Sequence, residues 1–108
     1  MDDYYLPEIN AIGLIHVEKW LVENGYFDVT KKLLQSNDYG FIAKSNVEGI
    51  IVQIRTFLHP RKPFKLSEFE IKALAIKAEK LSLVAYAAYV IIDEKDELAS
   101  DILWERLT

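Results

Sequence analysis

The sequence concentrates basic side chains in and near one short segment, residues 59–65, which reads HPRKPFK and contains two prolines. Lysine and arginine grouped in this way can neutralise backbone phosphates, and the nearby Phe57 and Phe64 offer rings on which bases can stack. The pattern predicts a nucleic-acid-binding loop, with candidate residues Arg55, Arg61, Lys62 and Lys65. The alternative is an ordinary solvated loop whose two phenylalanines belong to the core.

Other residue types that carry out catalysis are sparse. His16 and His59 are the only histidines, and the chain has no cysteine to complete a thiolate zinc site with them. No serine stands in a GxSxG context, and the four glycines are too scattered to form a phosphate-cradling loop. We therefore expect His16 along the packing edge of a first helix and His59 at the start of the basic loop.

Length and composition favour one small domain, residues 1–108, with a hydrophobic core, because 51% of the residues are hydrophobic. The net charge of −4 argues against a dedicated DNA-binding protein, although residues 44–80 hold eight Lys and Arg against four Asp and Glu. The opening MDDYYLPEIN lacks the apolar run of a secretory signal, and no run approaches the ~20 apolar residues that span a bilayer. We expect a cytoplasmic protein without membrane contact.

The elements that would position these residues alternate between helical and strand-like patterns. Apolar spacings of three to four residues predict a first helix through Ile9, Ile12, Ile15 or His16, and Trp20. Asn24-Gly25 ends this helix, and Ser67 with Glu70 forms a capping box that begins a second one. In chain order we expect a helix at 4–24, strands at 26–34, 40–44 and 50–58, a helix at 67–81, and strands at 83–92 and 98–107, with Leu103 and Trp104 partly covered.

This order resembles the αβββαβ core of the restriction-endonuclease-like superfamily, the PD-(D/E)XK nucleases. Three segments also resemble sequence motifs of that family: KWLVENGYF, GFIAK and IIVQIRTF. The resemblance covers nearly the whole chain; each motif is weak by itself, and their order and spacing carry most of the weight. It implies an α/β fold whose central mixed sheet is flanked by two helices.

In this family an aspartate and a glutamate on neighbouring strands hold one or two Mg²⁺ ions, and a lysine orients or activates water. The present sequence departs at each position: Gly40 stands for the aspartate, Gln53 for the glutamate and Arg55 for the lysine. Leu14 replaces a glutamate that is often found in the first helix. Because glycine removes the main metal ligand and arginine is effectively never deprotonated, the resemblance implies a fold kept after catalysis was lost.

The alternative is that the carboxylates that bind the metal have moved to neighbouring positions in the sequence, which we call migrated ligands. Asp38 lies two residues before Gly40, on the same side of an extended strand, and Glu18 lies one helical turn after Leu14. Glu18, Asp38 and Gln53 could then rebuild a weak Mg²⁺ site. Against this, Asp38 belongs to the polar stretch SNDYG, and Glu18 suits a solvated helix surface.

We therefore expect a non-catalytic nuclease-fold protein that acts as a binding or interaction module and needs no cofactor. Its partner would be nucleic acid, through the basic loop, or another protein. Two other hypotheses are a weak Mg²⁺-dependent nuclease with migrated ligands and a purely structural homo-oligomeric subunit. Exposed Tyr4, Tyr5 and Trp104, with an edge strand at residues 98–107, would favour a homodimer.

Overall fold

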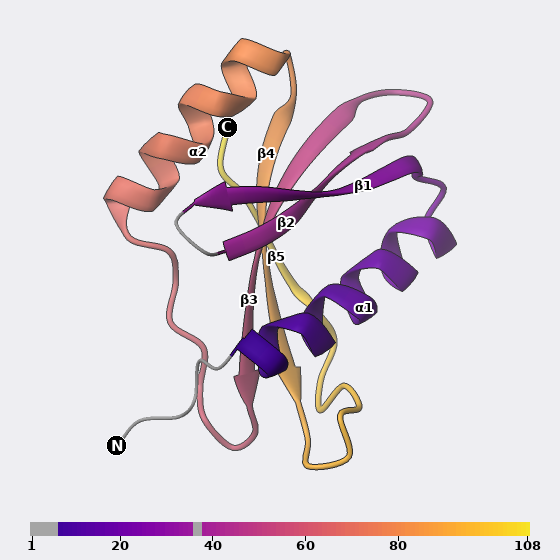
Figure 1. Ribbon diagram of the computed structural model, residues 1–108, viewed down its shortest axis with the longest axis vertical. Coiled ribbons are helices and arrows are strands. Elements are labelled where there is room, and N and C mark those ends of the chain that lie inside the picture. The colour runs from indigo at the N-terminus through magenta and orange to yellow at the C-terminus, as the bar shows by residue number, and fades with distance from the viewer. Residues whose placement is uncertain (1–6, 36–37) are drawn as a thin grey trace.

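The computed structural model describes residues 7–35 and 38–108. Two helices and five strands follow one another in the expected order αβββαββ (Figure 1). Their bounds are α1 Pro7–Glu23, β1 Phe27–Gln35, β2 Asp38–Lys44, β3 Gly49–Leu58, α2 Glu68–Leu81, β4 Val84–Ile92 and β5 Leu103–Arg106.

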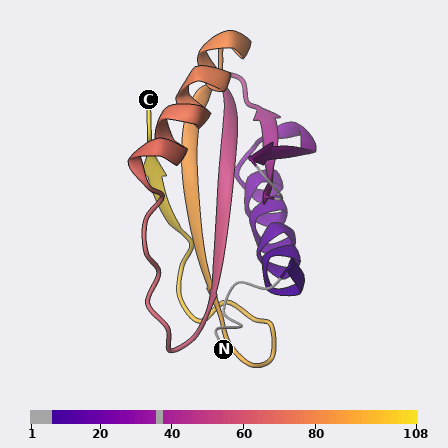
Figure 2. The ribbon, with the colours of Figure 1, turned by 60° about the vertical axis from the view of Figure 1, so that its left-hand side comes forward.

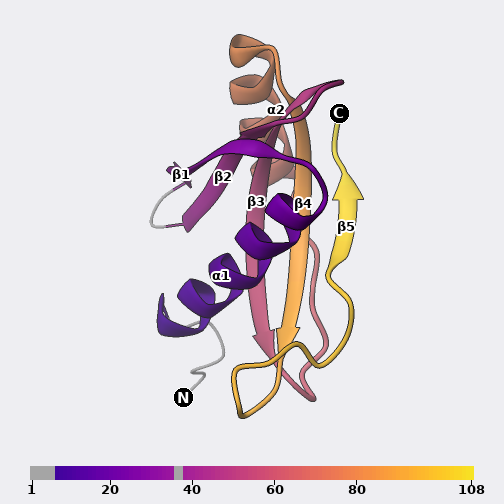
Figure 3. The same ribbon diagram turned by 90° about the vertical axis from the view of Figure 1, so that its right-hand side faces the viewer.

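The five strands form one mixed sheet in the order β1-β2-β3-β4-β5. Neighbouring strands are antiparallel except for β3 and β4, which run parallel and pair over nine consecutive residues, from Ile50↔Val84 to Leu58↔Ile92. Figure 3 shows these two long strands side by side with β5 next to β4. The parallel pair requires a crossover connection, and α2 supplies it.

The two helices cover opposite faces of the sheet, so the molecule has three layers (Figure 2). On the α1 face, Val17 and Leu21 pack with Val52, Ile54 and other strand residues in one buried cluster. On the α2 face, Leu74 and Ala78 pack with Ile51 and Ala85. Strands covered on both sides are largely apolar rather than alternating, which explains the composition of β4 and, apart from Gln53, Arg55 and Thr56, that of β3.

Helix α1 approaches β3 closely at Gly13, where an added Cβ would meet the Thr56 hydroxyl oxygen. This approach lets the buried Thr56 hydroxyl donate to the Asn10 side-chain oxygen over 3.1 Å. The sequence pattern predicted that either Ile15 or His16 lies on the packing face of this helix. The prediction for Ile15 is wrong, because 66% of this residue is exposed. The helix instead presents Leu14, Val17 and Leu21 as its most buried residues.

Helix α2 begins as predicted. The Ser67 hydroxyl accepts the Glu70 backbone N–H and the Glu70 carboxylate accepts the Ser67 N–H, which completes the capping box. The segment after β3 leaves the sheet at Leu58, as the prolines of the basic loop predicted. Within the described residues, no helix is both long and apolar enough to cross a membrane.

The last strand differs from its prediction. We expected a strand over residues 98–107, but β5 spans Leu103–Arg106, and Leu98 makes only an isolated bridge to Ile92. The polar residues Ser100 and Asp101 lie in the bend between them, and such residues favour turns over strands. Leu103 is also more exposed than expected, at 47%, whereas Trp104 is partly covered. Tyr4 and Tyr5 lie outside the described residues.

Candidate functional site

Strands β2 and β3 bring together the positions at which the resemblance places the nuclease site. Gly40 pairs directly with Gln53 across the two antiparallel strands, although the two residues are thirteen positions apart in the sequence. Arg55 lies two residues after Gln53, so both side chains project from the same face of β3. The contact of Arg55 with Glu70 of α2 identifies this face as the α2 face.

Arg55 is held between two carboxylates. Its Nη2 lies 3.4 Å from Asp38 Oδ2 and donates a second hydrogen bond to Glu70 Oε2. The side chains of Arg55, Asp38 and Glu70 are 11%, 16% and 24% exposed. A guanidinium that is largely withdrawn from water between two carboxylates forms charge-assisted hydrogen bonds, which are stronger than neutral ones. We call these three residues the arginine clamp.

Glu70 connects the clamp to the start of α2. Its Oε1 accepts the Ser67 backbone N–H over 2.9 Å, while Oε2 accepts from Arg55. Burial raises the pKa of this carboxyl, but the Ser67 N–H and the Arg55 charge together outweigh burial and lower the pKa below its usual value. The carboxylate is therefore held ionised by two partners from different parts of the fold.

Gly40 leaves no room for a side chain. An added Cβ would meet the Val52 carbonyl oxygen on the paired strand and would lie 2.5 Å from Leu34 Cδ1. Backbone atoms cannot move aside as the end of a flexible side chain can. An aspartate at this position would require the two strands to separate, so a metal ligand cannot be restored here without rearrangement.

The migrated ligands do not come together. Asp38 is bound within the arginine clamp, on the α2 face. Glu18 is exposed on α1, the helix that covers the other face of the sheet. In the part of the chain that the structure describes, no three His, Asp or Glu side chains gather where they could hold a metal ion.

The four predicted nucleic-acid-binding residues divide into one buried charge on β3 and three more accessible charges in the basic loop, residues 59–65. Arg55 belongs to the clamp and is 9% exposed, whereas Arg61 is half-buried and Lys62 and Lys65 are exposed. Lys65 Nζ lies 3.5 Å from Glu105 Oε2, a surface contact that typically contributes at most ~1 kcal/mol. Of the four predicted nucleic-acid-binding residues, three thus remain on or near the surface.

The loop is anchored where it rejoins the fold. The Leu66 N–H donates to the Tyr89 hydroxyl over 3.0 Å, and that hydroxyl donates to Glu105 Oε1 over 3.1 Å. Phe57 is buried, and Phe64, about half exposed, packs edge-on against it with ring centroids 5.2 Å apart. Phe57 is therefore a core residue and not a stacking platform for a base.

The histidines lie as the sequence predicted. His16 is partly buried on α1, where its Nε2 donates to the Asp96 carbonyl oxygen over 2.8 Å, and this bond joins the helix to the β4–β5 loop. His59 is exposed at the start of the basic loop. The sequence reasoning missed one residue of the site, Glu70, which it recognised only as half of a capping box.

No family model and no curated protein matches this sequence. Among solved structures, the chain is similar to Hjc, a Holliday junction resolvase of the archaeal hyperthermophile Archaeoglobus fulgidus, with a TM-score of 0.59 and 15% sequence identity. The match covers 88% of this chain and 72% of Hjc, which belongs to the restriction-endonuclease-like superfamily. The mixed five-stranded sheet with its two helices and this likeness show that the chain has the restriction-endonuclease-like α/β fold of the resolvase.

Proposed function

We propose that this chain is a non-catalytic member of the nuclease fold and serves as a nucleic-acid-binding module. The observation that carries the proposal is the arginine clamp. Where active members of the fold place a lysine beside metal-binding carboxylates, Arg55 sits between Asp38 and Glu70.

The clamp opposes nuclease chemistry in two ways. Arginine stays protonated, so it cannot accept a proton from water as a lysine with a shifted pKa can. Its positive charge also occupies the space beside the two carboxylates that a Mg²⁺ ion would need, and Mg²⁺ binding requires carboxylate oxygens that are not already neutralised. Gly40 contributes no ligand and has no space for one.

The accessible charges of the basic loop are the proposed contact surface. Lys62 and Lys65 are exposed immediately after β3, on a segment whose far end is anchored by Tyr89. The rest of the chain carries a net negative charge, which would direct a phosphate backbone toward this region and away from other surfaces. The structural neighbour is named as a Holliday junction resolvase, so branched DNA is the first substrate to test.

The test is fluorescence anisotropy with a labelled four-way DNA junction, a linear duplex and a single strand, each titrated at several salt concentrations. Binding through two or three phosphates predicts a log–log salt slope of about −2 to −3. The double variant Lys62→Glu/Lys65→Glu should lose most of the affinity, and its slope should become shallower by roughly one unit per lost contact. Lys19→Glu, an exposed charge change on α1, is the matched control and should retain binding.

Two outcomes would reject the proposal. If no nucleic acid binds at low salt, the basic loop is ordinary solvated surface. If the wild type binds but the double variant binds equally well, the contact surface lies elsewhere. Absence of binding together with stable self-association would favour the structural-subunit hypothesis instead, to be measured by light scattering on the same samples.

A further inference from the structure

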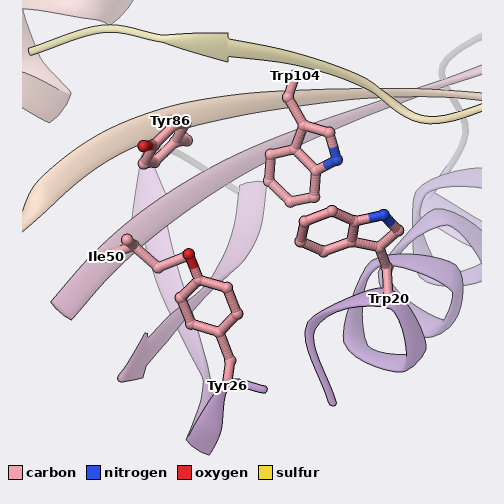
Figure 4. Close-up of a pocket in the computed structure, with 5 residues that line it drawn as sticks. All are labelled: Trp20, Tyr26, Ile50, Tyr86 and Trp104. Carbon is pink, nitrogen blue, oxygen red and sulfur yellow. The ribbon is translucent and has the colours of Figure 1, made fainter. Parts of the chain in front are cut away.

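A pocket opens on the α1 face of the sheet, the opposite face from the arginine clamp. Five residues from five parts of the chain line it: Trp20 of α1, Tyr26 between α1 and β1, Ile50 of β3, Tyr86 of β4 and Trp104 of β5 (Figure 4). Its volume is about 280 Å³, slightly below the ~300–1,000 Å³ of sites for drug-sized molecules. The size suits a small organic group.

Three of the four aromatic rings form tilted or edge-on pairs. Trp20 and Trp104 have ring centroids 4.6 Å apart at an angle of 43°, and Tyr86 meets Trp104 nearly edge-on at 85°. All four rings are partly exposed, and Ile50 is almost completely buried. Figure 4 shows the rings around a common space, with both indole nitrogens on the side away from Tyr26. The pocket therefore presents ring faces and carbon edges rather than indole N–H groups.

Charged groups of both signs lie next to the pocket, and the negative one is the Glu48 carboxylate. Burial raises the pKa of the Tyr26 hydroxyl, and the charge of Glu48 and its hydrogen bond to this hydroxyl raise it further. Among the described residues, no lysine or arginine lines the pocket. The positive group is Arg106, which pairs with Tyr86 and so lies on the same face of the sheet, where its Nε donates to the Thr108 carbonyl oxygen over 2.6 Å.

We propose that this aromatic pocket binds a methylated or quaternary ammonium group. Ring faces carry the negative part of the aromatic quadrupole, so the ring faces turned toward this space attract a cation that is too bulky and too weakly hydrated to prefer water. Glu48 adds a carboxylate close enough to the Tyr26 hydroxyl to interact with it. A planar base would be held best between two parallel rings, whereas the rings that line this pocket meet at 43° and 85°.

The chain carries its own reporter for this site. It has two tryptophans, Trp20 and Trp104, and both line the pocket, so intrinsic fluorescence responds directly to occupancy. The probe is choline chloride, titrated at constant ionic strength against sodium chloride. Its neutral carbon isostere, 3,3-dimethylbutan-1-ol, has the same shape without the charge. The proposal predicts saturable binding of choline and about tenfold or more weaker binding of the isostere, as a cation–π contribution implies.

A charge-only variant tests the electrostatic part. Glu48→Gln keeps an oxygen that can accept the Tyr26 hydrogen bond but removes the charge, so choline should bind severalfold more weakly while the isostere is unaffected. Glu79→Gln, an exposed change on α2, is the matched control and should bind like the wild type. Equal binding of choline and its isostere, no saturable response to choline, or tighter binding of adenosine than of choline would each overturn the proposal.

Discussion

Replacing Arg55 by methionine removes the charge of the arginine clamp while keeping a long side chain. Asp38 and Glu70 would then face each other without the guanidinium that both contact in the wild type. Two carboxylates at a largely buried site repel each other and have lost their solvation as well. The variant should fold but with clearly reduced stability.

The expected loss follows from the burial of the three side chains. Removing one partner from a fully buried ion pair costs about 3–5 kcal/mol. The clamp is 11–24% exposed, and water reaches Glu70 most readily, so we expect a loss of about 2–3 kcal/mol after this screening. For a domain of this size, that corresponds to a fall in Tm of roughly 10 °C.

The loss should depend on pH. The folded-state pKa of Glu70 is lowered, so its contribution to stability is present above its unfolded pKa of about 4.3 and disappears as the pH falls through the folded value. Methionine at position 55 removes one cause of that lowering. Lowering the pH therefore reduces the free energy of unfolding less in the variant than in the wild type. The difference in free energy of unfolding between the two proteins should narrow below about pH 4.

Urea denaturation followed by tryptophan fluorescence at pH 7 and near pH 4 measures both effects. Lys62→Met, which removes an exposed cation of the basic loop, is the matched control and should change stability by no more than about 0.5 kcal/mol. Adding Glu70→Gln to Arg55→Met should recover part of the loss at pH 7. If Arg55→Met unfolds within about 0.5 kcal/mol of the wild type at pH 7, the clamp is solvated and the reasoning fails.

Three further predictions concern the surrounding structure. Gly40→Asp should destabilise the fold by at least ~1–3 kcal/mol, because its Cβ meets the Val52 carbonyl, and calorimetry should show no stabilisation of this variant by Mn²⁺; restored metal binding would contradict this. Tyr89→Phe leaves the buried Leu66 N–H without its acceptor and should cost about 1–3 kcal/mol in urea unfolding, a neutral effect being the contrary result. If the chain forms a homodimer through β5, light scattering should give twice the monomer mass and Leu103→Lys should restore the monomer; a monomeric wild type would refute this interface.

The order of elements could be predicted because each carries a strong local signal. The capping box marked the start of α2 to the residue, and the prolines of the basic loop marked where β3 leaves the sheet. The pairing of Gly40 with Gln53 is a finding of the structure, consistent with two strands joined by a short turn, since the turn sets the register of a hairpin. These features depend on residues close together in the sequence.

The arginine clamp could not be predicted, because its contacts span 15 and 17 residues and join three elements. Nothing in the local pattern of Glu70 indicated that its second carboxylate oxygen would reach Arg55. The aromatic pocket could not be predicted for the same reason: its residues are separated by up to 84 positions, and each resembles an ordinary core residue in its own segment. The predicted start of β5 was wrong because the apolar residues Leu98 and Ile102 suggested a continuous strand, although the chain bends between them.

The two edge strands of the sheet, β5 and β1, are poorly suited to pairing with a second copy of the chain, and the homodimer stays a prediction. β5 offers four residues for pairing, and the other edge strand, β1, carries two register shifts, with Asp28 at a φ of 52° within the first. Short edges, irregular pairing and exposed lysines such as Lys32 are features by which proteins limit edge-to-edge association. A dimer would therefore more readily form through side chains than through strand addition.

The most direct test of the central claim, that this nuclease fold no longer cleaves, is a cleavage assay. A labelled four-way junction, a linear duplex and single-stranded RNA would be incubated with excess protein and either Mg²⁺ or Mn²⁺, and the products resolved on denaturing gels alongside the Asp38→Asn variant. The arginine clamp predicts no product above the protein-free control with either metal. Metal-dependent cleavage by the wild type that Asp38→Asn abolishes would contradict it, because Asp38 would then be a metal ligand and not a partner of Arg55.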